Sequence, residues 1–153
     1  MRISARADYG IRALLELAAT PPDGGLVTGD RIAHAQGIPV KYLENILGEL
    51  RRARLVESSR GQEGGYRLAR GASTITLADV IRAIDGPLAG IRDDPPPNGS
   101  STRCAAGLRD VWIALRASMR AVLEKVTLAD VVDGRLPAPV RKLLRDPDAW
   151  TRR

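Results

Sequence analysis

Apolar and polar positions alternate with helical periodicity most clearly from Pro39 to about Arg54. Four apolar residues at spacings i, i+3, i+4 and i+7 predict one buried stripe: Leu43, Ile46, Leu47 and Leu50. Polar or small residues fall on the far side of the same helix: Lys41, Glu44, Asn45, Gly48 and Arg52. The pattern predicts a helix with one face anchored in the protein and the other face presented outward.

Two more helices are expected before this one. Residues 4–19 carry apolar side chains at helical spacing, and Ser4 is suited to cap the first turn. A short helix over residues 29–36 follows, with Thr28 as its N-cap and Gly37 as the residue that ends it in a left-handed turn. A helix, a short helix, a tight glycine turn and a two-faced helix form the layout of a helix-turn-helix.

A β-hairpin is expected directly after the third helix. Residues 55–59 and 66–69 alternate as short strands, and the glycine-rich stretch 60–65 between them forms the turn. A basic hairpin in this place is the wing of a winged helix. Thr76 then caps a fourth helix that ends before Gly86.

The second half of the chain contains one long amphipathic helix, expected over residues 105–125. Its apolar face consists of Leu108, Val111, Trp112, Leu115, Met119, Val122 and Leu123. At about 1.5 Å per residue this helix is roughly 30 Å long, more than a small winged helix can cover. Pairing with the same helix of a second copy is the simplest way to bury such a face, so a homodimer is expected.

These elements define a mainly α protein with a small β-hairpin, in which a winged helix-turn-helix is followed by a long C-terminal dimerisation helix. The expected division is a DNA-binding domain at 1–90, a flexible loop at 91–104, the dimerisation helix with a short following helix at 105–133, and a basic tail at 134–153.

Composition narrows the class of protein. Of the 153 residues, 44% are hydrophobic and 27% charged, an ordinary globular balance, and aromatics make up 3% with no Phe. No apolar stretch is long enough to span a membrane, and the first residues lack a signal-peptide core, which indicates the cytoplasm. The net charge of +6 suits a polyanionic partner such as double-stranded DNA.

The outward face of the third helix supplies the main candidate contacts with DNA. Lys41 suits guanine acceptors, Asn45 can pair with adenine, and Glu44 can accept from the cytosine amino group. A merely solvated helix face is the alternative, but the glycine turn before this helix and the basic hairpin after it favour base reading. Arg51 or Arg52 is expected to hold phosphate.

The wing and the helix starts complete the expected interface. Gly64 and Gly65 either satisfy turn geometry or also let the wing backbone approach DNA closely. Arg60 either enters a minor groove or is an exposed arginine without a partner. Tyr42 is expected either to donate to phosphate or to pack against the wing. The remaining candidates are Ser4, Thr28, Val40 and Tyr66.

Four stretches together resemble the IscR/NsrR/CymR family of bacterial regulators, the Rrf-type winged helix-turn-helix proteins. They are Met1-Arg2-Ile3-Ser4 with Asp8-Tyr9-Gly10; Gln36-Gly37-Ile38-Pro39 with Tyr42-Leu43-Glu44; Arg60-Gly61 with Gly64-Gly65-Tyr66; and Val126-Thr127-Leu128-Ala129-Asp130-Val131. The resemblance implies a homodimer that binds a roughly palindromic operator. It also implies a sensor, since many members respond to iron–sulfur clusters, nitric oxide, redox state or cysteine supply.

The chain departs from the cluster-binding members of that family. They hold the cluster mainly with three closely spaced cysteines in the loop that corresponds to residues 92–106, where this chain has one, Cys104. The last ligand position would fall at Ala106, and Asp8 matches a position where some relatives supply a carboxylate. One thiolate and one carboxylate do not make a cluster site, so no cofactor and no metal is expected.

We therefore expect a transcription regulator, most simply a repressor. The alternatives are an interaction module controlled by a partner protein and a thiol sensor that acts through Cys104, which is otherwise a small apolar residue at a helix start. The sole histidine, His34, is expected to lie at the surface or to contact the backbone, and not to be a ligand. The signal is left open between a small molecule, a partner protein and oxidation. No catalytic constellation, phosphate-binding glycine loop or zinc motif is present, so an enzyme is not expected.

Overall fold

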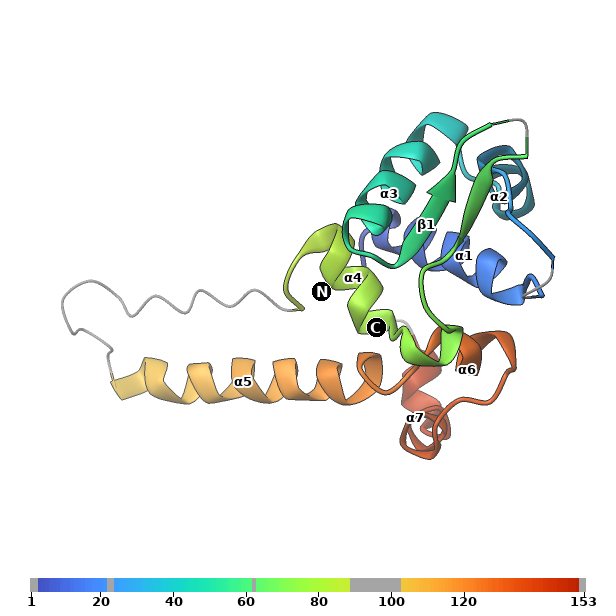
Figure 1. Ribbon diagram of the computed structural model, residues 1–153. Coiled ribbons are helices and arrows are strands. Elements are labelled where there is room, and N and C mark those ends of the chain that lie inside the picture. Colours follow the sequence, from blue (N-terminus) through green and yellow to red (C-terminus); the bar gives the residue numbers. More distant parts are fainter. Residues whose placement is uncertain (1–2, 22–23, 62, 89–102, 152–153) are drawn as a thin grey trace.

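Four helices and a two-stranded hairpin surround one apolar core in the N-terminal half of the computed structural model, and a long helix extends away from them (Figure 1). The structure describes residues 3–21, 24–61, 63–88 and 103–151, without the side chains of 103–106. The described elements are α1 (Ala5–Ala19), α2 (Gly29–Gln36), α3 (Val40–Arg52), β1 (Val56–Ser59), β2 (Gly65–Leu68), η1 (Ala72–Thr74), α4 (Leu77–Asp85), α5 (Arg103–Leu123), α6 (Leu128–Val132), α7 (Ala138–Leu143) and η2 (Pro147–Trp150). The predicted mainly α class with a small hairpin is confirmed.

Local capping sets the starts of the first two helices, as the sequence predicts. The Ser4 hydroxyl accepts a hydrogen bond from the Ala7 backbone N–H at 3.0 Å. The Thr28 hydroxyl accepts from the backbone N–H of Arg31 at 3.3 Å. Gly37 ends α2 at φ 63°, in the left-handed region where a Cβ is unfavourable.

The predicted stripe of α3 lies in the core. Leu43, Ile46, Leu47 and Leu50 are each at most 1% exposed. They pack with the buried residues Leu14 of α1, Ile32 of α2, Val56 of β1 and Ile75. Burial of such side chains stabilises a domain by roughly 1.5–3 kcal/mol each, so α3 is fixed in the domain by the side opposite to its polar face.

The hairpin is antiparallel and is extended by a third short stretch of chain. Val56 lies opposite Leu68, and Ser59 lies opposite Gly65. On the outer edge of β2, Val27 and Tyr66 exchange two backbone hydrogen bonds of 2.9 and 2.8 Å. The position of the wing is therefore tied to the segment between α1 and α2.

A six-residue pattern occurs twice, and the two copies pair with each other. Residues 75–80 read Ile-Thr-Leu-Ala-Asp-Val and residues 126–131 read Val-Thr-Leu-Ala-Asp-Val. Thr76 and Thr127 each begin a helix with a capping box. Backbone bonds of 2.9 Å run from Leu77 N–H to the Val126 carbonyl and from Leu128 N–H to the Ile75 carbonyl. This pairing fixes the chain that follows α5 to the N-terminal half of the molecule.

Helix α5 is anchored to the domain at its C-terminal end and extends far beyond it (Figure 1). Leu123 packs against a small cluster that includes Ala78 and Ile81 of α4. Glu124 accepts hydrogen bonds from Arg82 of α4 and, at 2.9 Å, from Arg120. These two guanidinium groups, Arg82 first, hold the pKa of Glu124 below its usual value.

Several predicted boundaries differ from the structure. Helix α3 ends at Arg52 rather than near residue 54, and Pro39 is its N-cap rather than its first residue. Helix α5 starts and ends two residues earlier than expected, at Arg103 and Leu123. It ends because the buried Val126 and the Thr127 cap redirect the chain. Residues 134–153 are expected as a basic tail, and the described part of that tail, up to residue 151, contains α7 and η2.

Candidate nucleic-acid interface

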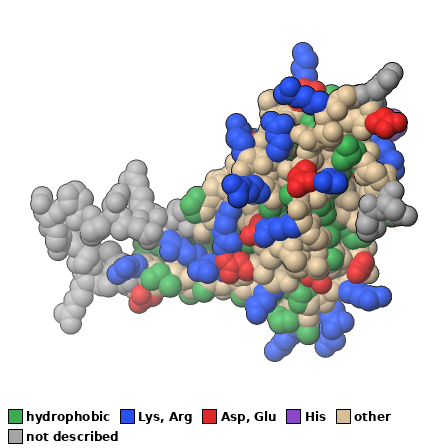
Figure 2. All heavy atoms as spheres, viewed as in Figure 1, with side chains coloured by type: hydrophobic (Ala, Val, Ile, Leu, Met, Phe, Trp, Pro, Cys, Tyr) green, Lys and Arg blue, Asp and Glu red, His purple; other side chains and the backbone are tan. Residues whose placement is uncertain are grey.

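The polar face of α3 lies at the surface. Lys41, Glu44, Asn45 and Arg52 are exposed, and Gly48 between them is partly exposed. Lys and Arg side chains gather over α3 and the neighbouring hairpin (Figure 2). The helix therefore presents hydrogen-bonding side chains in a positively charged surrounding, as a reader of base edges requires.

Tyr42 packs against α1. Its ring meets the ring of Tyr9 edge-on, with centroids 5.8 Å apart and an interplanar angle of 88°. The guanidinium of Arg12 lies 5.7 Å from the centroid of Tyr9. The ring contact of Tyr42 is therefore with α1, and both donation to phosphate and packing against the wing stay predictions.

A polar network from α1 holds the turn between α2 and α3. Arg12 donates to the Gln36 backbone carbonyl and, at 3.3 Å, to its side-chain oxygen. The Gln36 amide in turn donates to Glu16 at 3.0 Å. Sequence reasoning missed this network because its members lie 20 and 24 residues apart along the chain.

The two arginines at the end of α3 have different surroundings. Arg51 donates to the hydroxyl of Ser58 on β1 at 3.1 Å. Arg52 is 76% exposed and lies 3.9 Å from Glu49. Glu49 itself receives Arg6 of α1 at 2.6 Å, and this contact between α1 and α3 was also not predicted.

The wing glycines are required by close backbone packing. A Cβ on Gly65 would lie 2.7 Å from the Val27 carbonyl oxygen, and one on Gly64 would lie 2.6 Å from the Ser59 carbonyl oxygen. Gly65 is buried, whereas Arg60 is exposed. Turn and packing geometry thus accounts for both glycines, and an approach of their backbone to DNA stays a prediction.

Replacing Gly65 by alanine is expected to destabilise the protein by about 1–3 kcal/mol, because the new methyl group meets backbone atoms that have no rotamer to change. The separation of Val27 from β2 should also shift the wing. Urea unfolding measures the loss of stability. Gly48→Ala is the matched control: nothing lies within 4 Å of its Cβ position, and alanine in a helix should leave stability equal or raise it by up to about 1 kcal/mol. Equal unfolding midpoints for Gly65→Ala and the wild type would contradict the packing role.

The other predicted contacts are spread over the domain. The Ser4 hydroxyl caps α1 and donates to Asp85 of α4 at 2.8 Å. Thr28 is exposed at the start of α2, and Val40 is exposed at the start of α3. Tyr66 is half-buried in β2. The structure brings Thr28 and Tyr66 close, since Tyr66 pairs with Val27, and leaves Ser4 beside α4.

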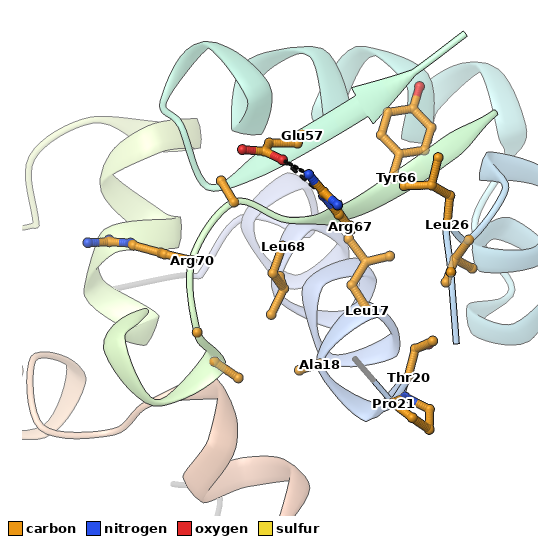
Figure 3. Close-up of a pocket in the computed structure, with 15 residues that line it drawn as sticks. Leu17, Ala18, Thr20, Pro21, Leu26, Glu57, Tyr66, Arg67, Leu68 and Arg70 are labelled. Atoms are coloured by element: carbon orange, nitrogen blue, oxygen red, sulfur yellow. Dashed lines mark hydrogen bonds and ion pairs between the residues drawn. The ribbon is translucent and has the colours of Figure 1, made fainter. Parts of the chain in front are cut away.

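A hollow of about 610 Å³ lies beside the hairpin, between α1, the segment before α2, β2 and η1 (Figure 3). Leu17, Ala18, Leu26 and Leu68 supply apolar walls. The ion pair of Arg67 with Glu57, at 2.7 Å, lies on its rim. A small molecule seated there would touch the strand that carries the wing.

The predicted dimer face of α5 is largely exposed in the single chain. Leu108, Val111, Trp112 and Leu115 are between 41% and 57% exposed, while Met119, Val122 and Leu123 are half-buried. Ile113, which the apolar periodicity did not include, is 48% exposed on another side of the helix.

The structure describes little of the predicted thiol sensor, Cys104. The backbone of Cys104 lies in α5, and its side chain is outside the described residues, as is the loop 89–102. His34 is exposed on α2. Among the described residues, no group of three His, Cys, Asp or Glu side chains could hold a metal ion. No helix in the described ranges is both long and apolar enough to cross a membrane.

Comparison with known proteins gives consistent similarities. The model of the family Rrf2, described as "Iron-dependent Transcriptional regulator", matches residues 3–134. The Mycobacterium tuberculosis protein Rv1287, named among HTH-type transcriptional regulators, is 53% identical over 150 residues, which cover 95% of this chain and 90% of that protein. The HTH-type transcriptional regulator CymR of Bacillus subtilis is 33% identical over 134 residues, 86% of this chain and 89% of the relative.

Solved structures agree with the sequence matches. The structure of CymR, the global cysteine regulator of B. subtilis, has a TM-score of 0.70 at 32% identity and covers 87% of this chain and 97% of its own. The structure of IscR from T. potens has a TM-score of 0.67 at 30% identity, over 100% of this chain and 93% of its own.

Proposed function

The chain belongs to the Rrf2 family of HTH-type transcriptional regulators, and from this premise we propose that it acts as a homodimeric repressor in the cytoplasm, at a palindromic operator. The carrying observation is the polar face of α3, exposed beside the wing while the leucine face of the same helix is buried. In this proposal α3 of each subunit reads a major groove, and each wing contacts the neighbouring minor groove.

The homodimer is supported by the geometry of α5. Its N-terminal half extends beyond the domain and exposes four large apolar side chains on one face. Two such helices that pack against each other bury these faces and join two copies of α3 in one two-fold assembly. A two-fold protein then predicts a two-fold operator, with half-sites about 10 bp apart or a multiple of that.

Selection of binding sites from random duplex DNA tests the proposal. We expect an inverted repeat, and we expect the complex with the selected duplex to have the mass of two chains and one duplex. A selected site without two-fold symmetry, bound by one chain, would contradict the homodimer. Recovery of no preferred sequence would contradict operator binding altogether.

The possible cluster ligands of this chain differ from those of the cluster-binding members of the family. The chain has one cysteine, and the Asp8 carboxylate lies 3.7 Å from the Arg12 guanidinium within α1. Iron–sulfur clusters need several soft ligands around the iron. We therefore propose regulation without a family-type cluster, even though the family description names iron.

Three signals fit the proposed repressor: a small molecule, a partner protein or oxidation of Cys104. The hollow beside the hairpin supports the small molecule, since two backbone hydrogen bonds between Val27 and Tyr66 join its wall to the wing. A ligand that binds the hollow more tightly in one position of the wing than in another would favour that position.

A further inference from the structure

At the junction between α3 and the wing, an exposed arginine is hydrogen-bonded to a partly buried serine. Arg51 is exposed near the end of α3, and its Nη1 donates to the Ser58 hydroxyl of β1 at 3.1 Å. The contact joins the two elements that the proposed function places in neighbouring grooves of DNA. It was not anticipated, because Ser58 has no distinguishing sequence signal.

Helical geometry places Arg51 on the flank of α3 that faces the hairpin. Glu44 lies seven residues earlier, and seven residues are nearly two turns, so these side chains leave the same flank of the helix. The opposite flank carries Tyr42 and Glu49, which contact Tyr9 and Arg6 of α1.

Both donors keep hydrogen-bonding capacity after they meet each other. Arg51 uses one nitrogen toward Ser58, and a guanidinium has five N–H groups. The Ser58 oxygen accepts in this bond, so its own O–H is left to donate. Among the described residues, no carboxylate lies within ion-pair distance of Arg51. Glu57, which precedes Ser58 in β1, accepts two hydrogen bonds from Arg67, at 2.7 and 2.9 Å.

We propose that Arg51 and Ser58 together bind one backbone phosphate of the operator, on the strand that separates the major groove read by α3 from the minor groove met by the wing. One sugar-phosphate strand lies between adjacent grooves, so it must cross the surface where α3 meets β1. A guanidinium and a hydroxyl bound to each other offer a charged and a neutral donor to the same phosphate oxygens. This inference rests on the proposed function.

The salt dependence of binding to the selected operator tests each donor separately. Arg51→Ala should weaken binding by about tenfold or more, and the slope of log K against log salt should become shallower by about 0.9, the value for one lost phosphate contact. Ser58→Ala should weaken binding by about two- to tenfold with no change in slope, because it removes a neutral donor. Arg141→Ala, on α7, is the matched control and should match the wild type in affinity and slope.

Single methylphosphonate substitutions identify the phosphate. A methylphosphonate at one position of the strand between the two grooves should weaken binding by the wild type and leave binding by Arg51→Ala unchanged. An unaltered slope for Arg51→Ala, or equal sensitivity of both proteins at every position, would overturn the proposal. If Arg51→Ala melts at a lower temperature than the wild type, Arg51→Lys is measured as well. This variant keeps the charge, so it should retain the wild-type salt slope. Absence of operator binding by the wild type would instead overturn the proposed function itself.

Discussion

Replacement of Leu115 by glutamate is expected to convert the protein to a monomer and to weaken operator binding by at least about 100-fold. Leu115 lies on the apolar face of α5 and is 41% exposed in the single chain, so a partner helix must cover it in the proposed dimer. A carboxylate buried there without a counter-charge costs several kcal/mol, by order of magnitude. A monomer also loses the gain of about 10²–10⁴ that comes from linking two half-site contacts.

Size-exclusion chromatography with light scattering measures the mass of the variant, and fluorescence anisotropy measures its binding to the operator. Leu143→Glu is the matched control, because Leu143 is a similarly exposed apolar residue, on α7. It should remain dimeric and bind as the wild type does. A Leu115→Glu protein that stays dimeric and binds normally would rule out this face of α5 as the interface.

The elements that depend on near neighbours in sequence could be predicted well. The buried stripe of α3, the Ser4 and Thr28 caps and the Gly37 turn are set within one or two helical turns, and all were found as expected. The hairpin was also found as predicted. Two short alternating segments joined by a glycine-rich turn are typical of a β-hairpin.

Contacts between distant elements could not be predicted in the same way. The environment of Tyr42 depends on which helix passes beside α3. That helix is α1, whose Tyr9 lies 33 residues earlier in sequence and meets the Tyr42 ring. The reason for Gly65 is the backbone of Val27, which no local pattern indicates. The partners of Arg51 and Glu49 are likewise set by tertiary packing, so the sequence indicated their charge but not their contacts.

The C-terminal half shows a further limit. Its long helix was expected from a single apolar face, yet Ile113 lies exposed on another side. Helix α7 is short and follows a proline, so its apolar periodicity is too brief to predict it. In both helices, apolar side chains that stay exposed in the single chain, such as Ile113 and Leu143, indicate a surface that could pack against another element. The pattern along the sequence did not indicate this.

The double substitution Lys41→Ala and Asn45→Ala is expected to remove most of the sequence specificity. Both side chains are exposed on α3, opposite its buried leucines, so truncation should leave the core intact. Each base contact contributes about 1–3 kcal/mol of discrimination, so the loss of two contacts corresponds to about a 30-fold to 2 × 10⁴-fold loss at the operator. Binding to unrelated DNA should fall much less, because phosphate contacts that carry no sequence information dominate it.

Competition between the selected operator and a scrambled duplex measures this specificity ratio directly. Lys142→Ala removes an exposed lysine of α7 and should leave the ratio unchanged. If the double variant loses affinity for both duplexes equally and the salt slope becomes shallower by about 0.9, Lys41 contacts phosphate and not a base. A wild-type ratio with the melting temperature preserved would mean that neither Lys41 nor Asn45 reads a base of the operator.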